Sequence, residues 1–302
     1  MEVRYPDHLR EEVEGYLRQM RFSEEPLTAG LEEAMRYSLL AGGKRIRPVL
    51  SLATARALGR PHREVLPLAG SIELIHTYSL IHDDLPAMDD DELRRGQPTC
   101  HVKFGEDVAI LAGDGLYAEA FRHMLTHQRC EPARVLAAAA ELASATGVNG
   151  MVGGQFADVR PSGSEGPRSL RRVHELKTGR LIGASVLCVL LLTGIEDAEL
   201  ARPFRRFAAE LGVLFQIVDD ILDVTGTEDA LGKPRGSDER HGKHTYVSEF
   251  GIERARELAA ESHATVRAAL AEIACVRADG GAPEHTTVEL EDIADFIFTR
   301  TS

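Results

Sequence analysis

Ser71-Ile-Glu-Leu-Ile-His-Thr-Tyr-Ser-Leu-Ile-His-Asp-Asp-Leu-Pro-Ala-Met-Asp-Asp-Asp91 is the stretch that decides the fold: an apolar segment that runs into a group of aspartates. Pro86 disfavours helical geometry at Leu85, so the chain is expected to turn there and to bring Asp89 back towards Asp83. Carboxylates at the C-terminal end of a helix oppose the helix dipole. The segment therefore indicates either a solvated helix end or a place where bound cations compensate the charge.

Helical spacing of apolar residues extends over most of the chain. In residues 29–40, for example, Leu31, Met35 and Leu39 recur at intervals of four. Further helical stripes are expected at 49–58, 66–81, 108–125, 135–148, 170–192, 204–223 and 252–273, with an extra N-terminal helix within 2–20 and a loop at 161–167. Strand-like alternation of useful length is absent. We therefore expect an all-α fold in which residues 1–302 form a single large helical bundle.

Charge and composition exclude several classes of function. The formal net charge of −13 argues against a general affinity for nucleic acid or for anionic lipid surfaces. Apolar residues make up 43% of the chain, which is enough for a large core. No apolar run approaches the roughly 20 residues that span a bilayer, because the longest candidate, at 181–192, is interrupted by Gly183 and Ser185. We expect no nucleic-acid partner and no stable membrane insertion.

Cysteine usage and the first residues indicate the compartment. The four cysteines are widely scattered and form no CxxC pair: Cys100, Cys130, Cys188 and Cys275. Such a pattern is typical of free thiols in a reducing compartment. Residues 1–14 are charged throughout, unlike a signal peptide. A cytoplasmic location is therefore expected.

A second acidic cluster follows a different apolar run. Asp219 and Asp223 are four residues apart and share a helix face with Gln216, and Asp220 lies beside them. Uncompensated carboxylates beside a core face are unfavourable. Two such clusters, each ending a buried helix, indicate a hard-cation site shared across a cavity. Mg²⁺ fits, because its protein sites combine a few carboxylates with waters and substrate phosphates.

Basic residues interleave with these acidic clusters. A glycine pair precedes Lys44, Arg45 and Arg47, and further basic groups stand at Arg94, Arg95, Lys177, Lys233 and Lys243. Any one of them is equally consistent with ordinary surface charge, but the combination indicates a multiply charged phosphate ligand. His76 lies two helical turns before Asp83 on nearly the same face. It is a candidate ligand-binding residue or, alternatively, a buried structural histidine.

Taken together, these motifs resemble those of trans-isoprenyl diphosphate synthases of the polyprenyl synthetase family. The first aspartate-rich motif is similar to Asp83-Asp84-x-x-x-x-Asp89 followed by Arg94 and Arg95, and the second to Asp219-Asp220-x-x-Asp223. The segments 42–47, 177–179, 215–216 and 233–243 fall in the family's order. The resemblance covers about residues 31–246, and more loosely the rest.

The resemblance implies the isoprenoid synthase fold with a central active-site cavity, usually in a homodimer. It implies three Mg²⁺ ions held by Asp83, Asp84, Asp89, Asp219 and Asp223. The residues implied to surround the allylic diphosphate are Arg94, Lys177, Thr178, Gln216, Lys233 and Lys243. Isopentenyl diphosphate is implied to bind without metal through Lys44, Arg47, His76 and Arg95. The catalytic residues are implied to be Asp83, Asp89, Asp219 and Lys177.

The implied reaction joins isopentenyl diphosphate head-to-tail to dimethylallyl or geranyl diphosphate. Loss of diphosphate leaves an allylic cation, which the isopentenyl double bond attacks before a proton is lost to the released diphosphate. Metal ions and basic groups would stabilise the leaving group. An apolar pocket would protect the cation from water.

Tyr78 is the candidate that sets product length. It lies five residues before Asp83, roughly 7.5 Å deeper along a helix. An aromatic ring there, with the longer first motif, is similar to bacterial farnesyl diphosphate synthases, so the fifteen-carbon product is expected over geranylgeranyl diphosphate. The alternative is an ordinary core tyrosine.

Two other functions are open to the same residues. A class I terpene cyclase also uses an aspartate-rich first motif and Mg²⁺, but its second motif would be of the Asn/Ser/Glu type. A non-catalytic partner subunit of another synthase would have lost aspartates or basic ligands, which this chain retains.

Overall fold

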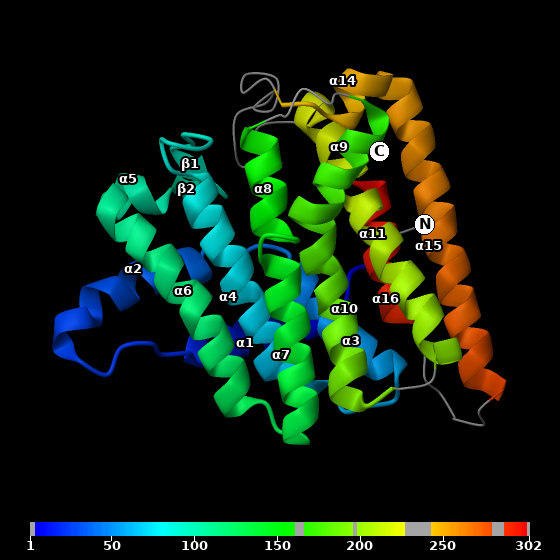
Figure 1. Cartoon of the computed structure of the whole chain (residues 1–302), viewed down its shortest axis with the longest axis horizontal. Helices are drawn as coiled ribbons and strands as arrows, with labels where there is room; N and C mark the ends of the chain where they lie inside the picture. The colour runs from blue at the N-terminus through cyan, green and yellow to red at the C-terminus, as the bar shows by residue number, and fades with distance from the viewer. Residues whose placement is uncertain (1–3, 161–165, 196–197, 227–242, 280–286, 301–302) are drawn as a thin grey trace.

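Helices account for nearly all regular structure in the computed structural model, which describes residues 4–160, 166–195, 198–226, 243–279 and 287–300 (Figure 1). The longer helices are α1 (Asp7–Gln19), α2 (Ala29–Leu39), α3 (Ile46–Ala57), α4 (Leu66–Asp83), α6 (Glu106–His127), α7 (Pro132–Thr146), α10 (Arg180–Thr193), α11 (Ala198–Thr225), α15 (Ile252–Asp279) and α16 (Val288–Thr299). The expected all-α fold is confirmed. Helices lie within all the expected ranges, including the N-terminal one. Of the loop expected at 161–167, residues 161–165 lie outside the described residues.

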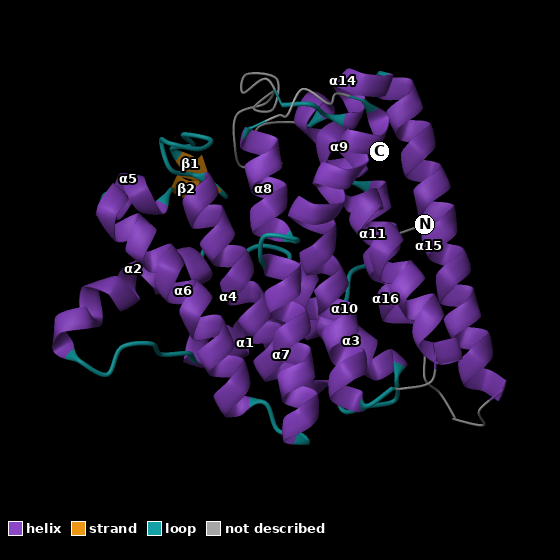
Figure 2. Ribbon diagram, viewed as in Figure 1, coloured by secondary structure: helices purple, strands orange, loops and turns teal. Residues whose placement is uncertain are grey.

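Short elements connect these helices and were mostly not expected. They are η1 (Pro26–Thr28), η2 (His62–Val65), α5 (Cys100–Phe104), α8 (Met151–Val159), α9 (Pro167–His174), η3 (Glu175–Gly179) and α14 (Tyr246–Phe250). Two tiny antiparallel strands, β1 (Leu93–Arg94) and β2 (Gln97–Pro98), form a ribbon, the small orange element in Figure 2. Elements this short carry too few apolar residues for a clear period.

Helices α4 and α11 bring the two acidic segments to the same end of the molecule. Helix α10 contacts both of them, while α4 also packs on α3 and α6, and α11 on α15. The contacts are apolar: Ile72 and Ile75 in α4, and Phe204 and Phe207 in α11, are fully buried. Figure 1 shows α4 and α11 on either side of α8 and α10, with their C-terminal ends near the top of the view. The two aspartate clusters therefore lie at the same end of the bundle.

Two helical stretches, Pro132–Val159 and Ser169–Thr193, are long and apolar enough in composition to cross a membrane. Both stretches are longer than the apolar run that the sequence shows at 181–192, because each stretch contains more than one helix. A turn at 147–150 separates α7 from α8, and a π-helical turn, η3, precedes α10. About half of each window, 44% and 56%, is buried inside the protein. This pattern is that of core helices.

A buried ion triad anchors the loop before α3. The Arg45 guanidinium donates to Glu14 Oε1 at 2.7 Å and to Glu73 Oε1 at 2.6 Å, and its third donor reaches the Leu39 carbonyl. Arg45 has a left-handed backbone, with φ of 54°, and its side chain is fully buried. Because α1, α4 and this loop meet at one cation, the segment that carries Arg47 has a defined path into the core.

Arg45→Ala should destabilise the protein by about 3–5 kcal/mol, because the two carboxylates would stay buried without their partner. Urea unfolding at neutral pH measures the change. The matched control is Arg122→Ala, which breaks an exposed pair with Glu119 and should cost less than about 1 kcal/mol. Equal losses in the two variants would contradict the role of the triad.

Candidate active site

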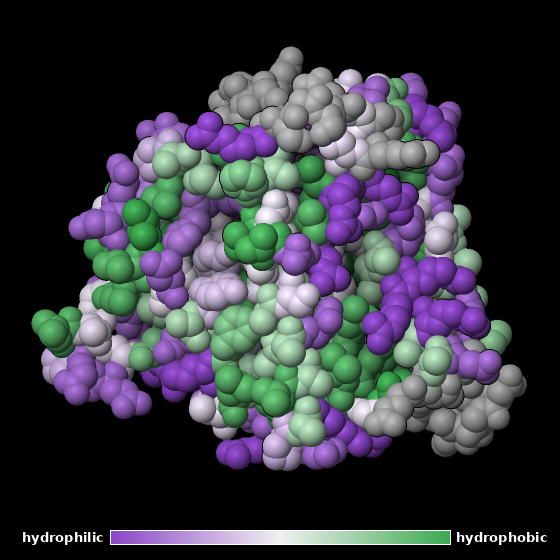
Figure 3. All heavy atoms as spheres, in the orientation of Figure 1, coloured by the Kyte–Doolittle hydropathy of each residue, from purple (hydrophilic) through white to green (hydrophobic). Residues whose placement is uncertain are grey.

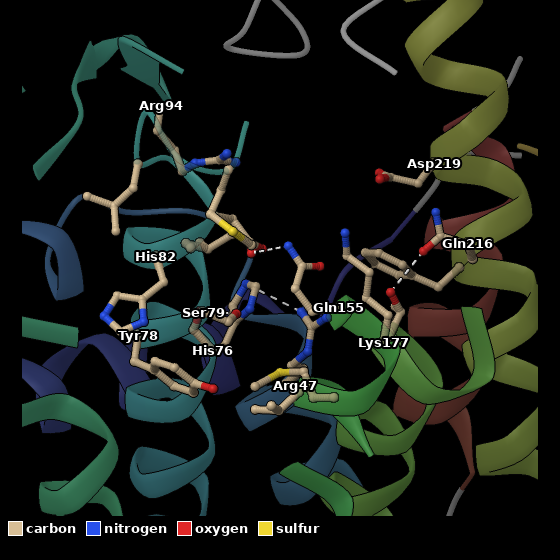
Figure 4. A pocket seen from close by; sticks show the side chains of 18 of the residues that line it. Arg47, His76, Tyr78, Ser79, His82, Arg94, Gln155, Lys177, Gln216 and Asp219 are labelled. Atoms are coloured by element: carbon tan, nitrogen blue, oxygen red, sulfur yellow. Dashed lines mark hydrogen bonds between the residues drawn. The ribbon is translucent and has the colours of Figure 1, made fainter. Parts of the chain in front are cut away.

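A cavity of about 690 Å³ opens between α4, α8, η3 and α11. Its polar lining brings together ten of the residues expected from the sequence: Arg47, His76, Tyr78, Asp83, Arg94, Arg95, Lys177, Thr178, Gln216 and Asp219. Figure 4 shows Arg94 and Asp219 on opposite sides of the cavity, with Gln155 and Lys177 between them. Residues far apart in the sequence thus converge on one space.

The first acidic segment turns as expected. The Asp89 backbone N–H donates to the Asp83 carbonyl at 2.9 Å, which closes a loop around Pro86. The Asp83 carboxylate lines the cavity and accepts a hydrogen bond from Gln155 Nε2 at 2.6 Å. Asp84 is 3% exposed and accepts from Arg94 Nε at 2.7 Å. Of this pair only Asp83 lines the cavity, whereas Asp84 holds Arg94 in place.

The second acidic segment divides in the same way. Asp219 lines the cavity with half of its side chain exposed, 3.9 Å from Arg300. Asp220 is buried and accepts from Gln216 Nε2 and from the Tyr246 backbone N–H, both at 2.7 Å. Asp223 lies one turn further along α11, buried and outside the cavity lining. Asp219 is therefore the carboxylate of this cluster that faces the cavity.

Burial changes the ionisation of the first cluster. It raises the pKa of the Asp83 carboxyl above its usual value, although Lys177 offsets part of the effect. Burial also raises the pKa of Asp84 to about 6, against the opposing charge of Arg94. Burial therefore opposes the charged form of both carboxyls, so charging them costs stability.

Arg47, His76 and Arg95 form the basic wall nearest α3 and α4. Arg47 Nη1 lies 3.4 Å from His76 Nε2, and Arg47 Nε has no hydrogen-bond partner among the described residues. Burial lowers the pKa of Arg47 to about 10 and, with the positive charge of Arg47, holds the pKa of His76 well below its usual value. His76 is thus a neutral donor or acceptor beside a charged guanidinium. Such a wall suits an anion that brings no metal with it.

Arg95 rests on the glycine pair of the 42–48 segment. Its guanidinium donates to the Gly42 carbonyl, and a Cβ on Gly43 would lie 2.7 Å from Arg95 Cζ. Both glycines have positive φ, 83° and 118°. A side chain at Gly43 would displace Arg95 from the cavity wall.

Two further basic candidates lie outside the cavity lining. Lys44 is exposed and lies over the Phe296 ring, 5.0 Å from its centroid, rather than in the cavity lining. Lys243 Nζ pairs with Asp89 Oδ2 at 2.9 Å, and neither residue belongs to that lining. Lys233 falls outside the described residues.

The sequence interpretation missed three polar residues. Gln155 and Asp158 are on α8, and Asp158 Oδ2 accepts from Lys177 Nζ at 2.6 Å. Arg300 follows α16 and lines the cavity beside Asp219. The signal for α8 was the run Gly153-Gly154-Gln155-x-x-Asp158, a glycine pair followed by two polar residues three apart. Arg300 had no local signal.

An aromatic cluster forms the wall below the first acidic segment. The Tyr78 ring, which lines the cavity, packs edge-on against Tyr117 with centroids 5.0 Å apart and against His82 at 5.4 Å. Tyr117 in turn packs on Phe121. Burial raises the pKa of Tyr78 to about 12, so the ring stays neutral.

The donor set fits Mg²⁺ better than a structural metal. Within the ranges described, no three His, Cys, Asp or Glu side chains converge on one point. Asp83 and Asp219 instead offer oxygen ligands from opposite walls, with basic groups between them. Mg²⁺ commonly binds through one or two carboxylates and completes its shell with water and substrate phosphates. Such a site would assemble only around a phosphate ligand.

Residues 28–276 match the polyprenyl synthetase family, and the chain belongs to that family. It is 50% identical over 232 residues to a farnesyl diphosphate synthase of Geobacillus stearothermophilus, covering 76% of this chain and 78% of that protein. It is 48% identical over 234 residues to a chloroplastic geranylgeranyl pyrophosphate synthase of Capsicum annuum, covering 76% of this chain. The match spans 63% of the length of that plant relative.

A solved structure shares the fold. The geranyltransferase of Helicobacter pylori, complexed with magnesium and isoprenyl diphosphate, superposes with a TM-score of 0.85 at 33% identity, covering 97% of this chain and 96% of that one. The expected isoprenoid synthase fold is confirmed.

Asp83→Asn should stabilise the ligand-free protein at neutral pH. Because the folded-state pKa of Asp83 is raised, its contribution to stability is fully present below the unfolded-state pKa and is lost as pH rises through the folded-state value. Asn keeps an acceptor for Gln155 and carries no charge. The variant should therefore have the higher free energy of unfolding at neutral pH, and the difference should close towards about pH 4. Urea unfolding with a chelator present measures both.

The matched control is Asp90→Asn in the same run of aspartates. Asp90 is exposed and has a φ of 51°, a conformation that Asn tolerates. If both variants gained the same free energy of unfolding at neutral pH, burial of Asp83 would not be the cause of the gain.

Proposed function

We propose that this chain catalyses the Mg²⁺-dependent condensation of isopentenyl diphosphate with dimethylallyl or geranyl diphosphate, and that farnesyl diphosphate is the main product. The observation that carries the proposal is the placing of Asp83 and Asp219 on opposite walls of one cavity. Five basic side chains line the same cavity: Arg47, Arg94, Arg95, Lys177 and Arg300. This combination suits two diphosphate groups, one bound through Mg²⁺ and the other bound directly by basic side chains.

The allylic diphosphate would occupy the acidic side of the cavity. Asp83 and Asp219 would hold Mg²⁺ there, with Asp89 at the rim; bound Mg²⁺ would neutralise charge on the departing diphosphate. The motif resemblance supports three ions per site, with Asp84 and Asp223 as supporting groups. The residues assigned to the same diphosphate are Arg94, Lys177, Thr178, Gln216, Lys233 and Lys243.

Isopentenyl diphosphate would occupy the wall formed by Arg47, His76 and Arg95. Neutral His76 and charged Arg47 lie within 3.4 Å of each other, so both can donate to one diphosphate. Lys44 would join them from the loop before α3. The C–O bond of the allylic substrate breaks, the isopentenyl double bond attacks the resulting cation, and a proton leaves to the released diphosphate. The basic groups stabilise that leaving group as its charge develops.

Product length is proposed to depend on Tyr78. The relatives named above include both a farnesyl and a geranylgeranyl synthase at similar identity, so identity alone does not separate the two products. The Tyr78 ring projects into the cavity with Tyr117 behind it, which supports the shorter product. A geranylgeranyl diphosphate synthase is the alternative.

The proposal includes a homodimer in which residues 1–302 work as one domain. Its support is the set of large apolar side chains left exposed on neighbouring helices: Leu111 on α6, Leu136 on α7 and Phe156 on α8 are 56%, 66% and 69% exposed. Figure 3 shows hydrophobic residues gathered on this face of the molecule where α7 lies. Exposed apolar patches of this kind mark association surfaces. A cytoplasmic location is proposed on the four free thiols.

An excess of chelator should abolish condensation, and Asp219→Ala should lower kcat by at least about two decades while the protein stays folded. Asp114→Ala, an exposed aspartate on α6, is the control that should keep activity. Product assays with both substrates measure the rates. Full turnover in chelator would overturn the proposal, and product formed from the allylic diphosphate alone would favour a terpene cyclase.

Tyr78→Ala should lengthen the product, because removal of the ring leaves space for further isoprene units. Tyr78→Phe keeps the ring and should give the wild-type product. Extraction and sizing of the prenyl chains measures both. An unchanged distribution in Tyr78→Ala would place the floor of the pocket elsewhere.

A further inference from the structure

Helix α8 carries two polar side chains that belong to neither acidic motif. Gln155 and Asp158 are three residues apart and therefore share a face of the helix. Gln155 donates to the cavity-facing Asp83 at 2.6 Å, and Asp158 accepts from Lys177 Nζ at 2.6 Å. One short helix thus contacts a carboxylate on α4 and a cation on η3.

The backbone of α8 lies directly against the turn that bears Lys177. A Cβ on Gly154 would be 2.2 Å from the Lys177 backbone N, a separation that real side chains do not reach. On the other side of the turn, a Cβ on Gly212 of α11 would be 2.7 Å from Gly179 Cα. The π-helical turn η3 therefore lies between two glycine contacts. Such turns are frequent at functional sites.

These contacts locate the backbone of Lys177 but leave its side chain free to rotate. The lysine stem is flexible, and its ammonium carries three rotatable donors. Asp158 takes one of these donors, and both side chains are mostly buried, at 13% and 23% exposure. Among the described residues Asp158 is its one hydrogen-bond partner, so two donors remain for a ligand in the cavity. Holding the ammonium in advance removes an ordering cost from ligand binding.

We propose that Asp158 is a positioning residue that orients the Lys177 ammonium towards the diphosphate of the allylic substrate. This inference rests on the proposed function, because it assigns Asp158 a part in binding one of the two proposed substrates. Asp158 acts through Lys177 and needs no contact with substrate. Its contact is with Lys177, which is assigned to the allylic diphosphate.

Asp158→Asn tests the proposal, because it keeps the shape of the side chain and removes the charge. The KM for the allylic diphosphate should rise about tenfold, while the KM for isopentenyl diphosphate stays unchanged. Calorimetry with inorganic diphosphate and Mg²⁺ should show a similar loss of affinity. Asp7→Asn, which breaks the exposed pair with Arg10, is the matched control and should change neither value.

A double-mutant cycle separates positioning from structural support. In a Lys177→Ala background, Asp158→Asn should have no further effect on diphosphate affinity, because the group through which Asp158 acts is gone. An equal loss in both backgrounds, or a fall in kcat with both KM values unchanged, would overturn the positioning role. A wild-type protein that neither condenses the substrates nor binds diphosphate would overturn the proposed function as well. Wild-type turnover with an indistinguishable Asp158→Asn would overturn this inference alone.

Discussion

Repulsion among carboxylates at one end of a helical bundle is the constraint on which the rest of this structure depends. Asp83 and Asp219 face a common cavity, and three neighbouring acids are paired with cations: Asp84 with Arg94, Asp89 with Lys243 and Asp158 with Lys177. The cations come from the β1–β2 ribbon, from the segment before α14 and from η3. The acidic ends of α4 and α11 can lie close together because these segments bring positive charge to them.

The long helices could be predicted from the sequence, because their apolar residues extend over several helical turns. Helices α4, α6, α10 and α11 each contain apolar residues over several turns, and Pro86 marks the turn after α4. The convergence of Asp83 with Asp219 was also inferable, because two acidic helix ends require a common counter-charge. Adjacent aspartates were harder to separate: Asp83 faces the cavity and Asp84 does not, since successive helical residues point about 100° apart.

Other parts of the site leave little trace in sequence. Helix α8 has nine residues, two of them glycine, so neither its existence nor the direction of Gln155 could be read from periodicity. Lys44 follows a glycine pair as expected, but the left-handed conformation at Arg45 sends Arg45 inward and Lys44 towards Phe296. Arg300 comes to Asp219 only through tertiary packing of α16 on α11.

The cavity draws its lining from positions between Arg47 and Arg300, nearly the full span of the described chain. Contacts so distant in sequence form late and together, because loop closure must come before they can stabilise anything. No contiguous fragment contains the site, and local fraying of one helix end would already separate groups that belong together. Turnover in this protein would therefore be a sensitive measure of cooperative folding, because local unfolding of any one of the contributing helices would abolish it.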